Sequence, residues 1–180
     1  MPPISTRQAA GACRHCACPR ATVTLVRASL TILSLLLAAA PGLADAQTLE
    51  SAKAFVVGLY DRYSHGEPDY AGKDAPKTFS PKLVRLIRRD QAHTPAGDVG
   101  ALDGDPICDC QDPGGLKLIG VDVQAVGQGA AKAAARIRFG GDPGLTVKLD
   151  LVWLGGAWRV SDVHTKDMPS LVALFEHPPG

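Results

Sequence analysis

The sequence predicts an α+β fold in which an N-terminal pair of helices packs on a four-stranded antiparallel sheet. Three observations predict it. In two segments between residues 48 and 93, apolar residues recur every three or four positions, which is the period of a helix. From residue 116 onward they recur every second position, which is the period of a strand. Glycine-rich turns separate four such strands, and helices followed by a run of strands are typical of the α+β class.

The helices have clear start signals. Thr48 is a suitable N-cap for a first helix over residues 48–64, because its hydroxyl can accept a free backbone N–H. Ser80 followed by Pro81 predicts the start of a second helix, which ends near His93. Strands are expected at about residues 116–125, 132–139, 145–153 and 158–163, with a last short helix at 170–175. Between the helices and the strands lies a long loop, residues 96–115.

Composition and charge fit a globular protein with its own core. The chain has 180 residues, of which 46% are hydrophobic and 21% are charged. Its 19 basic and 18 acidic residues give a net charge of +1. Because the sequence shows no strongly basic region, nucleic acid is not an expected partner.

The N-terminal quarter has the pattern of a secretory signal peptide. The uncharged apolar run 28–40 follows Arg27 and is followed by a Pro-Gly breaker and an A-x-A sequence at 44–46. As a helix, the run is too short to span a bilayer. We expect cleavage after Ala46, so that residues 1–46 are a signal peptide with a long n-region. Residues 47–180 would then form a single α+β domain without a stable membrane span, either periplasmic or secreted.

Two groups of cysteines differ in what they predict. Cys13, Cys16 and Cys18 have metal-ligand spacing together with a nearby histidine, His15, but they precede the apolar run and would be removed with it. Cys108 and Cys110 would remain, in an oxidising compartment where disulfides form.

The loop sequence DGDPICDCQD, residues 103–112, allows several interpretations. Its carboxylates suggest calcium, but Ile107 and Gly114 stand where an EF-hand loop needs acidic ligands. Cys108 and Cys110 are candidates for a local disulfide, whereas a catalytic thiol pair is disfavoured by the neighbouring carboxylates. Asp105 and Asp112 are expected to organise the loop by accepting hydrogen bonds from its backbone, and Gln111 is expected to tie the loop to the edge of the sheet. Neither a metal nor another cofactor is expected.

Asp162 and His164 are the candidates for an acid–base pair. They lie two positions apart on the last strand, so we expect both on one sheet face, together with Trp158 and Val160. A carboxylate and an imidazole on an apolar face can transfer protons. The alternative is that both reach solvent near the end of the strand.

Three motifs resemble a family of exported bacterial proteins, the domain-of-unknown-function family 3828. They are GLYDRY at Gly58–Tyr63, DPICDCQD at Asp105–Asp112 and GGAWRVSDVH at Gly155–His164. The family is similar to nuclear-transport-factor-2-like folds, so the resemblance implies a curved sheet wrapped around helices, often with a pocket. It implies no activity, and the lipid-acceptor cysteine of some members is missing here.

These observations favour an exported, non-catalytic module of the cell envelope that binds a small molecule or an envelope protein. Trp158 is a further candidate for binding. Because both faces of the last two strands are partly apolar, the outer face is also a candidate for homodimer formation. The alternative function is a small-molecule lyase or isomerase that uses Asp162 and His164 in a cone-shaped pocket.

Overall fold

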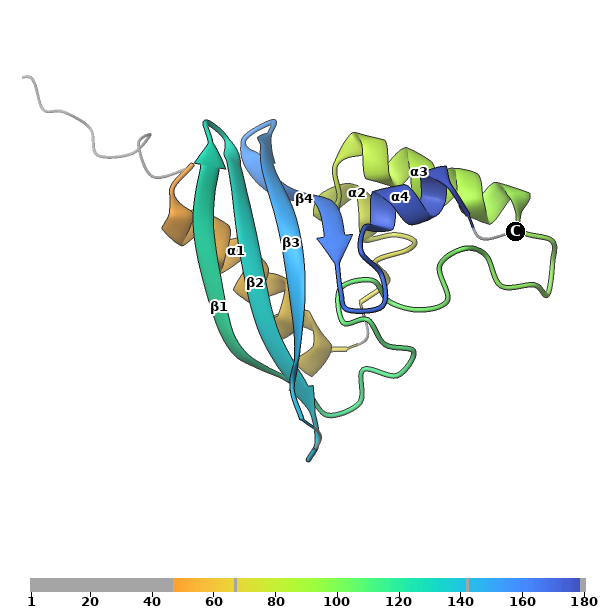
Figure 1. Cartoon of the computed structure of the whole chain (residues 1–180), viewed down its shortest axis with the longest axis horizontal. Helices are drawn as coiled ribbons and strands as arrows, with labels where there is room; N and C mark the ends of the chain where they lie inside the picture. The colour runs from red at the N-terminus through yellow and green to blue at the C-terminus, as the bar shows by residue number, and fades with distance from the viewer. Residues whose placement is uncertain (1–46, 67, 142, 179–180) are drawn as a thin grey trace, which may run out of the picture. The chain divides into compact units, whose positions relative to one another are not determined.

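Four antiparallel strands form one sheet in the order β1-β2-β3-β4 (Figure 1). They are β1 (Leu116–Gly127), β2 (Ala130–Phe139), β3 (Leu145–Leu154) and β4 (Ala157–His164). Gly155 and Gly156 both have positive φ, 57° and 83°, as a tight two-residue turn between β3 and β4 requires. The computed structural model describes residues 47–66, 68–141 and 143–178. The predicted signal peptide and the cysteines at 13, 16 and 18 lie outside this part.

The helices begin where their capping residues predict. The helical elements are α1 (Leu49–Asp61), which continues into a 3-10 turn (Arg62–Ser64), α2 (Ala75–Thr78), α3 (Pro81–His93) and α4 (Leu171–Glu176). The Thr48 hydroxyl accepts the N–H of Ser51, and the Ser80 hydroxyl accepts the N–H of Leu83. The short helix α2 lies in a segment for which no helix was predicted from the sequence. Among the described residues, no helix combines the length and the apolar character needed to cross a bilayer.

The two long helices pack in different places. Helix α1 lies behind the sheet in Figure 1 and packs on β1 and β2. Helix α3 packs against α4 and β4. Phe79, just before α3, forms a parallel bridge with Val160, and the N–H of Ser80 donates to the carbonyl of Val160. The chain between α2 and α3 therefore lies alongside β4.

The core lies between α1 and the inner face of the sheet. On β2 this face presents Ala131, Ala133 and Ala135, all at most 3% exposed, and their small size lets α1 approach closely. Larger side chains from β3 and α1 complete the core: Val147, Leu149, Leu151, Val56 and Leu59. The space on the inner side of the sheet is thus occupied by packed side chains.

Three irregularities change which side chains face the core. The pairing register shifts at Ile119 and Val126 in β1 and at Ser161 in β4. Each bulge inserts one residue into its strand, so the residues after the bulge change from one face of the sheet to the other. A period of two from residue 116 onward would place Ile119 on the same face as the buried Val121, but the bulge leaves Ile119 53% exposed.

Candidate functional site

A groove of about 950 Å³ lies over the outer face of the sheet, opposite α1. The strand residues that line it include Asp122, Lys132, Ala134, Thr146, Lys148 and His164. In the strand register, Ala134 pairs with Asp122 and Lys148, and Lys148 pairs with His164. Because Ala134 has the smallest side chain in this row, it forms the floor of the groove between charged walls.

Asp150 is the centre of a charged cluster beside the groove. Its carboxylate lies 2.6 Å from Lys132 Nζ and 3.2 Å from His164 Nε2. Burial raises the pKa of Asp150, but the hydrogen bonds and charges of Lys132 and His164 outweigh this effect and leave the pKa below its ordinary value. Asp150 is therefore a carboxylate with its partners already in place.

Both ring nitrogens of His164 are directed at oxygen atoms of the protein. Nδ1 lies 2.5 Å from the carbonyl oxygen of Pro169, to which it can donate. Nε2 is inaccessible to solvent and lies 3.2 Å from Asp150 Oδ2 and 3.8 Å from Asp162 Oδ2. It makes no well-aligned hydrogen bond. Neither nitrogen is open to a bound substrate.

Asp162 holds the start of α4. Its Oδ1 accepts the N–H groups of Val163 at 2.8 Å and Val172 at 3.0 Å, and its Oδ2 accepts the Ser170 hydroxyl at 2.7 Å. Ser170 is itself the N-cap of α4. These bonds occupy both oxygens of Asp162, so the side chain connects the end of β4 to the following helix.

The bulge at Ser161 corrects the predicted orientation of the acid–base candidates. Asp150 pairs with Asp162, and Leu151 pairs with Val160, so Ser161 is the inserted residue. Trp158 and Val160 face the core, whereas Asp162 and His164 face outward. The prediction that all four residues share a face is wrong, although Asp162 and His164 do lie on the same face as each other.

Replacing Asp162 with alanine is expected to loosen α4 and lower the free energy of unfolding by about 1–3 kcal/mol, because three donors lose their acceptor. Amide hydrogen exchange would show faster exchange at Val172 than in the wild-type protein. The exposed residue Asp167 supplies the control, since Asp167→Ala removes a carboxylate that forms no hydrogen bond or ion pair within the described chain. Unchanged exchange at Val172 in the Asp162 variant would contradict this role.

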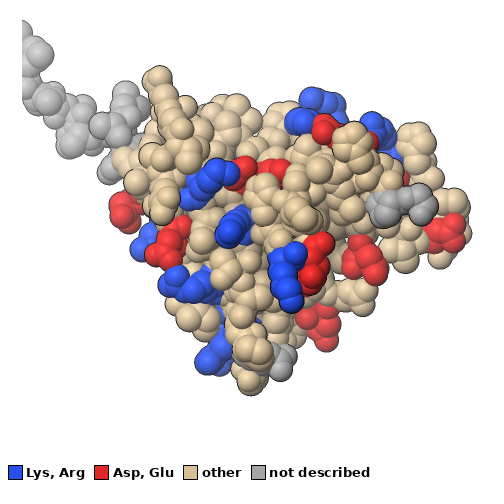
Figure 2. Space-filling model, in the orientation of Figure 1, with Lys and Arg blue, Asp and Glu red and all other residues tan. Residues whose placement is uncertain are grey.

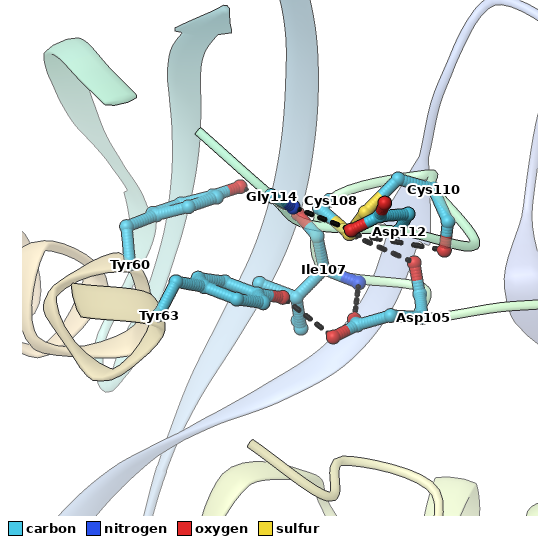
Figure 3. The surroundings of a disulfide bond; sticks show 8 residues. All are labelled: Tyr60, Tyr63, Asp105, Ile107, Cys108, Cys110, Asp112 and Gly114. Carbon is cyan, nitrogen blue, oxygen red and sulfur yellow. Dashed lines mark hydrogen bonds between the residues drawn. A yellow bond between two sulfur atoms is a disulfide. The ribbon is translucent and has the colours of Figure 1, made fainter. Parts of the chain in front are cut away.

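A disulfide joins Cys108 to Cys110 in the long loop (Figure 3). The two Cα atoms are 5.2 Å apart, and Cys108 is fully buried. Asp109 between them has a φ of 54°, in the left-handed region that few residues other than glycine adopt. Backbone N–H groups of Asp105 and Cys110 donate to each other's carbonyls across this turn. The loop is thus closed by covalent and hydrogen bonds, and Asp109 projects to the rim of the outer groove.

Two tyrosines of the first helical segment fix the same loop (Figure 3). The Tyr63 hydroxyl donates to Asp105 Oδ2 at 2.6 Å, and the Tyr60 hydroxyl donates to the carbonyl of Ile107 at 2.8 Å. The other oxygen of Asp105 accepts the N–H of Ile107 at 2.8 Å. Asp105 therefore organises the loop through the loop's own backbone and through Tyr63 in the 3-10 turn after α1. The tyrosines were not predicted as loop partners, although GLYDRY and DPICDCQD were both singled out in the sequence.

The environment of these tyrosines favours their neutral form. Burial, followed by the charge of Asp105 and the hydrogen bond to it, raises the pKa of Tyr63 above its ordinary value of 10.0. Burial is also the largest cause of the raised pKa values of Tyr60 and Tyr70. Tyr70 packs edge-to-face on Tyr63 with ring centroids 5.9 Å apart.

The protein is expected to lose stability steeply in alkali. Below pH 10.0, the ordinary pKa of tyrosine, these hydroxyl groups are protonated in both the folded and the unfolded chain. Their contribution to the free energy of unfolding is therefore complete in this range. As the pH rises further, the unfolded chain ionises first, so stability falls until the raised folded pKa is reached. Urea denaturation between pH 8 and 11 measures how steeply the free energy of unfolding falls with pH. Tyr63→Phe should reduce this slope by at most about 1.4 kcal/mol per pH unit. An equal slope in the variant would contradict this assignment.

The other predicted site residues have local roles. Gln111 Nε2 donates to Asp103 Oδ2 at 3.0 Å, and Asp112 Oδ1 accepts the N–H of Gly114 at 2.7 Å, both at the surface. Trp158 is only 4% exposed and packs in the core, so it is not placed to bind a ligand. In the described part of the chain, no group of three or more histidine, cysteine or acidic side chains is arranged to hold a metal ion.

Comparison with curated proteins gives a distant sequence relative. Uncharacterized protein YqhG of Escherichia coli (strain K12) is 31% identical over 109 residues, which are 58% of this chain and 35% of that protein. The chain therefore spans about a third of the length of this curated relative. No protein-family model matches the chain, so the resemblance to family 3828 and to nuclear-transport-factor-2-like folds stays a prediction.

Two solved structures are similar in part. Both are crystal structures of the type VI effector-immunity complex Tae3-Tai3 from Ralstonia pickettii, one native and one with selenomethionine. The matched chain of the native complex has a TM-score of 0.45 and 17% identity, covering 64% of this chain and 95% of that chain. In the second structure the TM-score is 0.43 and the identity is 16%, covering 64% and 97%.

Proposed function

We propose that this chain is an exported, non-catalytic binding domain of the cell envelope that holds a ligand or a protein partner in its outer groove. The observation that carries the proposal is that two polar side chains of the groove have no partner within the described chain. Lys148 and Thr146 lie on its floor, and neither side chain forms a hydrogen bond or ion pair with the described residues. Groups that remain unpaired in a groove of this size are available to a bound molecule.

The acid–base alternative has less support. A general acid or base must come within hydrogen-bond reach of the proton that it transfers. Both nitrogens of His164 are directed at protein oxygens, and both oxygens of Asp162 accept bonds from β4 and α4. These two residues therefore serve the structure, and a lyase or isomerase that depends on them is not the function we propose.

The composition of the outer face also bears on self-association. Permanent homodimer interfaces are usually more apolar than the remaining surface. Here the central rows of the outer face carry charged side chains, among them Lys132, Arg136 and Lys148. We therefore do not extend the proposal to a homodimer through this face.

Peptide binding followed by NMR tests the proposal directly. The full chain would be expressed with its own N-terminus, recovered outside the cytoplasm with the disulfide intact, and titrated with decapeptides of glutamate, lysine or glycine and serine. At least one peptide is expected to shift the amide signals of Thr146, Lys148 and His164. Filling the floor by Ala134→Leu should abolish these shifts, whereas Ala130→Leu, on the same strand outside the groove, should leave them unchanged.

Two results would overturn the proposal. One is the absence of groove shifts with every peptide up to millimolar concentration, and the other is equal shifts in the Ala134→Leu variant. Export is tested on the same preparation. N-terminal sequencing is expected to start at Gln47, and retention of residues 1–46 would contradict cleavage.

A further inference from the structure

We propose that the outer groove recognises an acidic polypeptide, a partner segment whose aspartate or glutamate side chains lie over β2 and β3. This inference rests on the proposed function, because it names the ligand class of the same groove.

The outer face of the sheet carries more cations than carboxylates. The strand register places six basic side chains on it: Lys117, Lys132, Arg136, Arg138, Lys148 and Arg159. Three carboxylates share the face, those of Asp122, Asp150 and Asp162. Figure 2, which views this face, shows more blue than red surface over the strands. Residues 47–180 as a whole contain more acidic than basic residues, so the positive charge is particular to this face.

The carboxylates of the face already have partners. Asp122 is paired with Arg136, whose guanidinium lies over Gly120, where a side chain would collide with it. Asp150 is paired with Lys132, and Asp162 accepts the bonds at the start of α4. Lys148 differs, because it has no partner among the described residues; its cross-strand neighbours on this face are Ala134 and His164. An incoming carboxylate would therefore meet a free ammonium group.

The floor of the groove allows a carboxylate to approach this ammonium group. Ala134 and Lys148 are paired across β2 and β3, and Thr146 lies two residues from Lys148 on the same face. The methyl group of Ala134 leaves space beside the lysine, and the Thr146 hydroxyl can donate a second hydrogen bond. A charge-assisted bond together with a neutral bond is a strong arrangement for a carboxylate.

The rim of the groove determines where the acidic groups lie. Asp109 from the disulfide loop lines the groove, as do Lys166 and Asp167 from the segment after β4, and none of these three side chains makes an ion pair with the described residues. Because these carboxylates repel like charge, we place the acidic side chains of the ligand over β2 and β3, away from the rim.

The composition of the face favours a polypeptide over nucleic acid. Single-stranded nucleic acids bind through aromatic side chains on which bases stack, in addition to basic residues. The outward-facing positions of the four described strands hold no Phe, Tyr or Trp, because Phe139, Trp153 and Trp158 belong to the inward-facing set. A peptide needs no such aromatic side chains and can bind through the charged groups of the groove.

Fluorescence anisotropy with labelled peptides tests the inference. In about 50 mM salt, where surface charges are weakly screened, the exported protein is expected to bind a glutamate decapeptide and not a lysine decapeptide. Lys148→Glu should weaken binding by at least about tenfold, because an attraction becomes a repulsion. Lys77→Glu makes the same charge change on α2, at an exposed residue without a partner in the described chain, and should alter binding by less than about twofold.

A substitution at the rim of the groove is expected to change the binding affinity in the opposite direction. Asp109→Asn removes a repelling charge and should tighten binding of the glutamate peptide, and asparagine tolerates the left-handed backbone at this position. Equal weakening by Lys148→Glu and Lys77→Glu would overturn the inference. Binding of the lysine peptide in the groove would also overturn it, as would tighter binding of a thymidine decamer than of the glutamate peptide. Either of these two results would leave the proposed function intact. Failure of every ligand to bind would overturn both.

Discussion

Replacing Trp158 with alanine is expected to lower the free energy of unfolding by about 3–5 kcal/mol, the usual range for a large buried aromatic residue. Trp158 is 4% exposed and packs edge-to-face on Trp153 with ring centroids 5.4 Å apart. Its Nε1 donates to the Ser51 hydroxyl at 2.9 Å, which connects β4 to α1 across 107 residues of sequence. The variant would lose this connection and leave a cavity between the sheet and α1.

Trp158→Phe separates packing from hydrogen bonding at this position. It keeps an aromatic ring in the core but removes the indole donor, so its loss of stability should be clearly smaller than that of the alanine variant. Urea denaturation followed by circular dichroism measures both. A loss below about 1 kcal/mol for Trp158→Ala would mean that the ring is not packed as described.

Replacing Asp105 with alanine is expected to cost about 2–4 kcal/mol, because hydrogen bonds to a charged acceptor are stronger than neutral ones. The substitution leaves the Tyr63 hydroxyl and the N–H of Ile107 without their acceptor. The loop would then lose its contact with Tyr63 while the disulfide remained. Hydrogen exchange at Ile107 should increase together with the loss of global stability.

Asp112→Ala is the matched control for this experiment. Asp112 is exposed in the same loop, and its side chain accepts only the N–H of the exposed Gly114. A surface substitution of this kind usually changes stability by no more than about 0.5 kcal/mol. If the two variants lost equal stability, Asp105 would have no special role in the loop.

The features that could be predicted from the sequence are those determined by interactions between residues close together in the chain. Thr48 and Ser80 start helices because a side-chain oxygen reaches a backbone N–H three residues away. Alternating apolar residues identified four strands because one face of the sheet is buried. The spacing of Cys108 and Cys110 likewise limited their pairing to a local bond, and the structure contains that disulfide.

The features that depend on distant contacts were not predictable in the same way. A bulge at Ser161 is set by how β3 and β4 align along their whole length, and it moved Asp162 and His164 to the outer face. The bond between Tyr63 and Asp105 joins residues 42 apart, and no local pattern indicates it. The groove also arises from the alignment of β2 with β3, which places Ala134 beside Lys148.

The bulges in β1 have a consequence for aggregation. Strand β1 is at one end of the strand order, so one of its sides pairs with no other strand of the described chain. An unpaired strand edge is a template for the addition of strands from other molecules. Register shifts at Ile119 and Val126 interrupt its regular backbone, and Lys117 and Asp122 add charge. Intermolecular β-pairing along this edge is therefore disfavoured, although the sheet is open.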